Sequence, residues 1–196
     1  MSILGTIPMF NSINPFPEVM GRSGGVVVNN TDFSLPLPAG IAIGDLIVIG
    51  VSTHAVNART FSGPPSGYTP LYNQAGAGNH RFLAAFYRQA TLSDVGASSV
   101  SMSASAGCNW AGTSYRIFKA SRIDAAAVSS SVDPPSHTTG YGVNGKLWIS
   151  FLHTVGSTSR TAPSGMGNQQ SQQQATNVAV NSADLILDAA SYDPAS

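Results

Sequence analysis

Residues 45–53 read DLIVIGVST and give the clearest strand signal in this chain of 196 residues. From residue 46 to residue 51 every side chain is apolar or glycine, a pattern typical of a strand that is buried on both faces. Residues 82–87 and 147–152 share this character. An isolated antiparallel sandwich exposes one face of each sheet, so its strands should alternate instead. Either loops or other subunits must therefore cover these strands, and we favour other subunits.

Shorter strand signals surround this segment and alternate with turns that are rich in glycine, proline and serine. Residues 162–175 (APSGMGNQQSQQQA) are polar and of low complexity, which predicts a flexible or hairpin-forming loop. Eight to ten short strands without a convincing helix predict an all-β fold, an antiparallel β-sandwich or jelly roll over residues 26–196. The expected strands lie at residues 25–28, 33–37, 45–53, 80–90, 98–105, 110–120, 147–155, 176–181 and 185–190.

Residues 1–25 precede this sandwich as an extended N-terminal arm that is rich in apolar side chains but lacks helical or strand periodicity. Pro8, Pro15 and Pro17 interrupt any helix, and the segment is too short to span a membrane. It lacks the features of a signal peptide, so we expect no secretion signal. Such an arm must lie on a protein surface, either its own domain or a neighbour. The residues expected to bind a partner are Ile3, Leu4, Ile7, Met9, Phe10, Ile13 and Phe16.

The composition is unusually poor in charge. Charged residues make up 9% of the chain, against about 25% in soluble domains, and the formal net charge is +0. Since no basic run or polybasic helix occurs, we expect neither nucleic acid nor a membrane as a partner. A near-neutral surface instead permits dense packing of identical copies. Cys108 is the single cysteine, so an internal disulfide is excluded.

No motif for catalysis stands out. The chain has no nucleophile elbow, P-loop, dinucleotide fingerprint or zinc-protease motif, and its histidines lack metal-ligand spacing. We therefore predict no catalytic residue, no metal ligand and no cofactor. Tyr68, Tyr72 and Trp110 are candidates for glycan binding, because flat aromatic rings stack on sugar faces. The alternative, which we favour, is that these rings fill the ends of the sandwich.

Several motifs follow one another in a fixed order: LPLPAGIAIGDLIVIGVS (35–52), PPSGYTPLYN (64–73), RFLAAFYRQAT (81–91) and SSVSMSASAGCNWAGTSYRIFKAS (98–121). Together they resemble a recurrent β-sandwich domain of tailed-bacteriophage virion proteins. The resemblance covers residues 33–124, with residues 183–192 as a closing strand. Tyr68 stands where Trp is commoner, and Ile117 stands where Gly often follows Tyr-Arg. The matching positions are Pro38, Ala39, Gly40, Gly44, Asp45, Pro65, Gly67, Tyr68, Thr69, Leu71, Tyr87, Arg88, Trp110, Tyr115 and Arg116.

The resemblance implies a structural role and no enzymatic activity. We expect a capsid decoration (cement) protein that binds the head through the major capsid protein, with a tail or fibre component that binds a receptor or carbohydrate as the alternative. Such a protein would be made in the host cytoplasm and carried on the virion. The doubly apolar strands predict a homo-oligomer, with a trimer as the leading choice.

Overall fold

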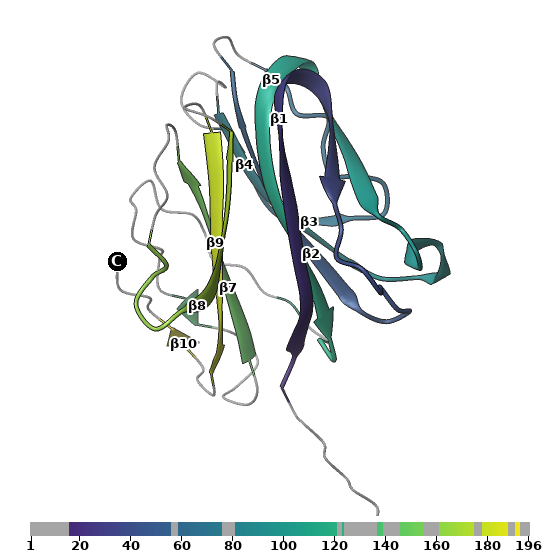
Figure 1. Ribbon diagram of the computed structural model, residues 1–196, viewed down its shortest axis with the longest axis vertical. Coiled ribbons are helices and arrows are strands. Elements are labelled where there is room, and N and C mark those ends of the chain that lie inside the picture. The colour runs from purple at the N-terminus through teal and green to yellow at the C-terminus, as the bar shows by residue number, and fades with distance from the viewer. Residues whose placement is uncertain are drawn as a thin grey trace, which may run out of the picture.

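The computed structural model describes residues 16–55, 59–75, 81–120, 123, 137–138, 146–154, 161–174, 178–187 and 191–192. A five-stranded sheet in the order β1-β5-β2-β4-β3 lies face to face with a three-stranded sheet in the order β7-β9-β8 (Figure 1). All neighbouring strands in both sheets are antiparallel, which confirms the predicted all-β sandwich. The strands are β1 (Glu18–Pro36), β2 (Leu46–His54), β3 (Thr69–Ala75), β4 (Arg81–Gln89), β5 (Ser99–Phe118), β6 (His137–Thr138), β7 (Lys146–Thr154), β8 (Gly167–Gln174), β9 (Val178–Leu187) and β10 (Ser191–Tyr192), and one short 3-10 turn, η2 (Leu92–Asp94), follows β4.

The core between the two sheets is built on one face of β2. Leu46 and Val48 of β2 belong to a cluster with Tyr115 of β5 and with Leu147 and Phe151 of β7. The Phe151 ring meets the Tyr115 ring edge-on, with 5.9 Å between the ring centroids. Leu46 and Val48, which lie on the same face of β2, therefore point toward the three-stranded sheet.

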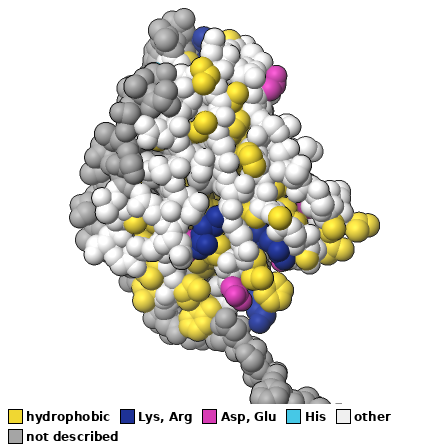
Figure 2. All heavy atoms as spheres, viewed as in Figure 1, with side chains coloured by type: hydrophobic (Ala, Val, Ile, Leu, Met, Phe, Trp, Pro, Cys, Tyr) yellow, Lys and Arg dark blue, Asp and Glu magenta, His cyan; other side chains and the backbone are white. Residues whose placement is uncertain are grey.

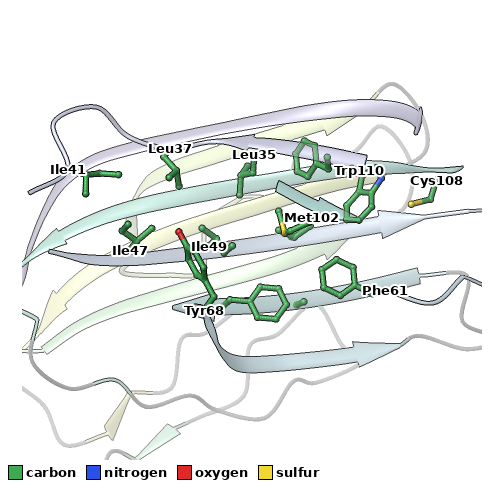
Figure 3. Close-up of a cluster of buried hydrophobic side chains, with 14 of the residues drawn as sticks. Leu35, Leu37, Ile41, Ile47, Ile49, Phe61, Tyr68, Met102, Cys108 and Trp110 are labelled. Atoms are coloured by element: carbon green, nitrogen blue, oxygen red, sulfur yellow. The ribbon is translucent and has the colours of Figure 1, made fainter. Parts of the chain in front are cut away.

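The opposite face of β2 is covered by a two-stranded ribbon, which is formed by the second half of β1 and the first half of β5. These strands are 19 and 20 residues long, and their pairing shifts register between Val27 and Asp32. Beyond the shift, the paired strands bend over the outer face of the five-stranded sheet (Figure 1). There Leu35 and Met102 pack in one cluster with Ile47 of β2 (Figure 3). Eight of the nine residues of β2 are buried as a result.

The expectation that other subunits cover residues 46–51 is therefore wrong, because the chain covers both faces of β2 itself. The apolar run in β2 consequently gives no argument for a homo-oligomer. The trimer stays a prediction that now needs a separate argument.

Several strand boundaries differ from the sequence prediction. Residues 25–28 and 33–37 form the single strand β1, and residues 98–105 and 110–120 belong to the single strand β5. The arm expected over residues 1–25 overlaps β1, since residues 18–25 pair with β5. Residues 1–15 lie outside the described residues.

The Gln-rich segment is a strand and not a flexible loop. β8 (Gly167–Gln174) pairs with β9 in an antiparallel hairpin, which confirms the hairpin alternative. Its composition misleads because backbone hydrogen bonds, and not apolar alternation, hold an edge strand in place. The Gln172 side chain lies over Gly24 of β1, where a Cβ atom would come within 2.6 Å of it.

Candidate interaction surface

One end of the sandwich gathers features that point to a binding surface. β1 and β2 begin there and β4 and β5 end there, as the pairs Glu18 with Phe118, Leu46 with Ile117, and Leu46 with Gln89 show. Residues 1–15 join the domain at this end, immediately before Phe16. We call it the arm end, and it is the lower end in Figure 1.

A buried ion pair fixes the loop that precedes β2. Asp45 is 2% exposed, and its Oδ2 accepts hydrogen bonds from Arg116 Nε at 2.6 Å and from the Ala42 amide at 2.8 Å. Arg116 Nη1 also donates to the Ala39 carbonyl at 3.3 Å. Gly40 has φ of +73° and lies so close that a Cβ atom would be 2.9 Å from Arg116 Nη1. The glycine is thus required. We call the Asp45–Arg116 ion pair, with the loop contacts of Arg116, the first clamp, because it fastens the loop to β5.

A second clamp of the same kind joins the turn that precedes β3 to the loop that follows β4. Arg88 Nη2 lies 3.2 Å from Asp94 Oδ2 and donates to Thr91 Oγ1 at 3.2 Å. Its guanidinium carbon is 6.0 Å from the centroid of the Tyr68 ring, and Gly67, at φ of +79°, passes beneath it. Burial and the nearby Asp94 carboxylate raise the pKa of Tyr68 to about 12, although Arg88 acts in the opposite direction.

The two clamps occupy equivalent positions on either side of β2. Tyr87-Arg88 on β4 and Tyr115-Arg116 on β5 both lie opposite residues 47–48 of β2. Both tyrosines therefore face the core between the sheets, and both arginines face the side of the ribbon. The positions that carry the resemblance thus include the two clamps, and their contacts give those residues a structural role.

The clamped loops carry exposed aliphatic side chains. Ile43 in the first loop is 65% exposed, and Leu92 and Val95 in the second are 76% and 48% exposed. The loops lie side by side, because the Gly44 amide donates to the Ala90 carbonyl at 2.9 Å. We call Ile43, Leu92 and Val95 the clamped-loop patch.

Further apolar side chains are exposed where β1 begins and where β5 and β9 end. Met20 is 47%, Phe118 44% and Ile186 46% exposed. Ile186 belongs to the same end, because it pairs with Leu147, which packs in the cluster that also holds Ile117. We call Met20, Phe118 and Ile186 the strand-end patch. Six of the eight exposed large hydrophobic side chains in the described part of the chain thus lie at the arm end, and Figure 2 shows hydrophobic side chains gathered on its lower part.

The charged side chains described at the arm end are of both signs: beside the two clamps they are Glu18 and Lys119, which are exposed, and Lys146. The clamps pair Asp45 with Arg116 and Asp94 with Arg88 within the domain. The Lys119 ammonium lies over the Phe118 ring, with 5.3 Å between Nζ and the centroid. A partner would therefore meet a surface that is mainly apolar and close to neutral.

A polar network joins the two sheets and sets how the three-stranded sheet sits on β1 and β5. Arg22 Nη2 lies 2.6 Å from Asp184 Oδ2, and Asn168 Nδ2 donates to Asp184 Oδ1 at 2.9 Å. The Tyr115 hydroxyl donates to Ser182 Oγ at 2.7 Å. Burial raises the pKa of Tyr115 to about 12, and the nearby Asp184 carboxylate acts in the same direction. Sequence reasoning missed this network, since its partners on β1 and β9 are 162 residues apart.

The predicted glycan-binding residues do not form one site. Trp110 is fully buried, stacks on Phe33 with 5.6 Å between centroids, and donates from Nε1 to the Asn30 carbonyl at 2.9 Å. Tyr68 is 8% exposed and lies in the same cluster (Figure 3). The structure thus places Tyr68 and Trp110 in the core, where they present almost no ring surface to a sugar. Tyr72 is half-buried, and burial raises its pKa.

Of the predicted partner-binding residues of the arm, Phe16 is half-buried at the arm end. Ile3, Leu4, Ile7, Met9, Phe10 and Ile13 lie outside the described residues. Cys108 is buried, which raises the pKa of its thiol to about 11.

The described residues contain no group of three histidine, cysteine or carboxylate side chains placed to hold a metal ion. None of the helical structure in that part of the chain has the length and apolar character to cross a membrane.

Comparisons with protein-family models, with curated proteins and with solved structures find no match for this chain.

Proposed function

We propose that this chain is a non-enzymatic structural protein of a tailed-bacteriophage virion, and specifically a decoration protein that binds the capsid surface. The family resemblance motivates the assignment. The structure adds a reason for the matching residues, because the two clamps and the buried Trp110 and Tyr115 shape a rigid sandwich. A rigid module with a mostly uncharged surface suits a role in which many copies are arranged closely on a particle.

The observation that carries the proposal is the concentration of exposed apolar side chains at the arm end. A soluble domain exposes single hydrophobic side chains all over its surface, whereas a group of them at one end marks an interaction site. Burying one large side chain contributes ~1.5–3 kcal/mol, and the strand-end patch starts about half exposed. Contact through this patch therefore supplies a few kcal/mol per copy, and the arm adds further apolar contact.

In this arrangement the strand-end patch and the base of the arm face the capsid, and the opposite end of the sandwich faces solvent. The partner would be a major capsid protein, which presents the same surface many times. Copies that also contact one another would bind the particle more tightly through avidity, and no additional contact with the capsid protein would be needed.

The alternative, a tail or fibre component that recognises a carbohydrate, loses most of its support. Two of the three aromatic rings that motivated it are buried in the core. The experiment below distinguishes binding to tails from binding to heads.

The test uses particles of the phage that encodes this chain, prepared without it, and separated heads and tails. We expect the full-length protein to bind heads, and the double variant Met20→Ser/Phe118→Ser to bind about tenfold or more weakly. Val28→Ser is the matched control, because Val28 is on β1, is 61% exposed and lies away from the arm end. Circular dichroism checks that all proteins are folded. Equal binding by the double variant, or binding to tails alone, would contradict the proposal.

A further inference from the structure

The clamped-loop patch has no assigned partner. We propose that it binds residues 1–15 of a second copy of the chain, so that each copy lends its arm to a neighbour. This goes beyond the proposed function, because it concerns contact between copies and does not require a particle.

The patch is held in place before any partner arrives. Ile43 lies between Ala42, whose amide donates to the Asp45 carboxylate, and Asp45 itself, which is bound by Arg116. Leu92 and Val95 flank Asp94, whose Oδ2 accepts hydrogen bonds from the amide and the hydroxyl of the preceding threonine at 2.8 and 2.9 Å. Loops that are already ordered lose little conformational entropy on binding, so exposed aliphatic side chains on them are effective anchors.

The chemistry of the patch selects an apolar and uncharged occupant. The carboxylates and guanidiniums beneath it neutralise one another, so a charged segment would lose hydration without gaining a partner. Residues 1–17 contain no Asp, Glu, Lys or Arg, and residues 1–15 are rich in large aliphatic and aromatic side chains. The N-terminal segment is therefore a good chemical match for the patch.

The position of the arm favours a second copy over the same copy. Asn14 and Phe16 each precede a proline, and a residue before proline is biased to an extended backbone. The patch lies across the sheet, above the start of β2 and the end of β4, which are two and three strands from β1. At about 4.8 Å per strand, the same arm would have to double back over roughly 10–14 Å. Fifteen extended residues instead span up to ~50 Å, enough to reach a neighbour.

Arms that pass from each copy to the next form a closed set, either a reciprocal dimer or a ring, if the rotation between copies closes. This gives the predicted homo-oligomer a basis in the arm end, in place of the apolar strand β2 that the chain covers itself.

The test uses the full-length chain in solution, without particles. We measure its mass over a range of concentrations by analytical ultracentrifugation, for the native protein and for Ile43→Ser/Leu92→Ser. The substituted side chains are exposed, so the fold should be retained, and Val28→Ser is the control of similar exposure. We expect the native protein and the control to associate, and the double variant to associate about tenfold or more weakly. A synthetic peptide of residues 1–15 should dissociate the native oligomer.

Three results would overturn the proposal. The first is a native protein that stays monomeric at every concentration. The second is a double variant that associates as well as the native protein. The third is a native oligomer that the peptide leaves intact while Ile43→Ser/Leu92→Ser weakens it, because the patches would then contact each other and not the arm. Since no particle is present, each of these results leaves the test of capsid binding untouched.

Discussion

Replacing Arg116 by alanine tests whether the first clamp stabilises the loop before β2. The substitution leaves the Asp45 carboxylate, which is 2% exposed, without the guanidinium 2.6 Å away. Removing one partner of a buried ion pair costs about 3–5 kcal/mol, because the remaining charge is buried and uncompensated. We expect a loss of unfolding free energy in that range. In a chain of 196 residues this corresponds to a fall in melting temperature of roughly 6–20 °C.

The second clamp supplies an internal comparison. Arg88 is more distant from its carboxylate, at 3.2 Å, and both side chains are more exposed, at 22% and 9% against 17% and 2% in the first clamp. Solvent screens this pair more strongly, so Arg88→Ala should cost about 1–2 kcal/mol. The structure thus predicts an order, with Arg116→Ala the more damaging change.

The assay is urea unfolding monitored by circular dichroism, supported by thermal melts. Lys119→Ala is the control, because Lys119 is an exposed cation on the same strand end as Arg116. A second variant, Asp45→Asn in the Arg116→Ala background, should recover part of the loss, since it removes the unpaired charge. The interpretation fails if Arg116→Ala costs less than ~1 kcal/mol, or if Arg88→Ala costs as much or more.

Three further predictions concern the core. Burial raises the pKa of Tyr115 from 10.0 to about 12, so the neutral phenol stabilises the fold below pH ~10. The unfolding free energy should fall by ~2–3 kcal/mol as the pH rises to ~12. Denaturation at several pH values should show a smaller fall for Tyr115→Phe than for the native protein. A Cβ at position 50 would overlap the Phe151 ring, so Gly50→Ala should cost about 1–3 kcal/mol in urea unfolding, whereas Gly167→Ala, with nothing within 4 Å, should change stability by less than ~0.5 kcal/mol. Cys108→Ser should lose less than ~2 kcal/mol in the same assay, and a larger loss would indicate a role for the thiol beyond packing.

The sequence was sufficient for the strands that carry a dense apolar run. β2 and β7 begin and end within a residue or so of the expected segments, because a dense apolar run has few alternative structures. It was not sufficient where one strand bends. Asn29, with φ of +43°, lies at the register shift in β1, and the turn-like residues there divide one strand into two apparent ones.

The surface was harder to predict than the fold. The Asp45–Arg116 pair joins residues 71 positions apart, and no local pattern reports such a contact. One signal was available, since Tyr-Arg occurs twice on aromatic strands, at residues 87–88 and 115–116. For Trp110 the sequence left burial and exposure as alternatives, because whether an aromatic ring fills a core or lines a surface depends on the ribbon that bends over it.

A cryo-electron microscopy reconstruction of the phage particle tests the proposed role without relying on any variant. We predict density for the sandwich on the capsid surface, with the start of β1 and the end of β5 toward the shell and the strand-end patch in contact with the capsid protein. A particle that lacks the protein, or one that carries it with the arm end directed into solvent, would contradict the account.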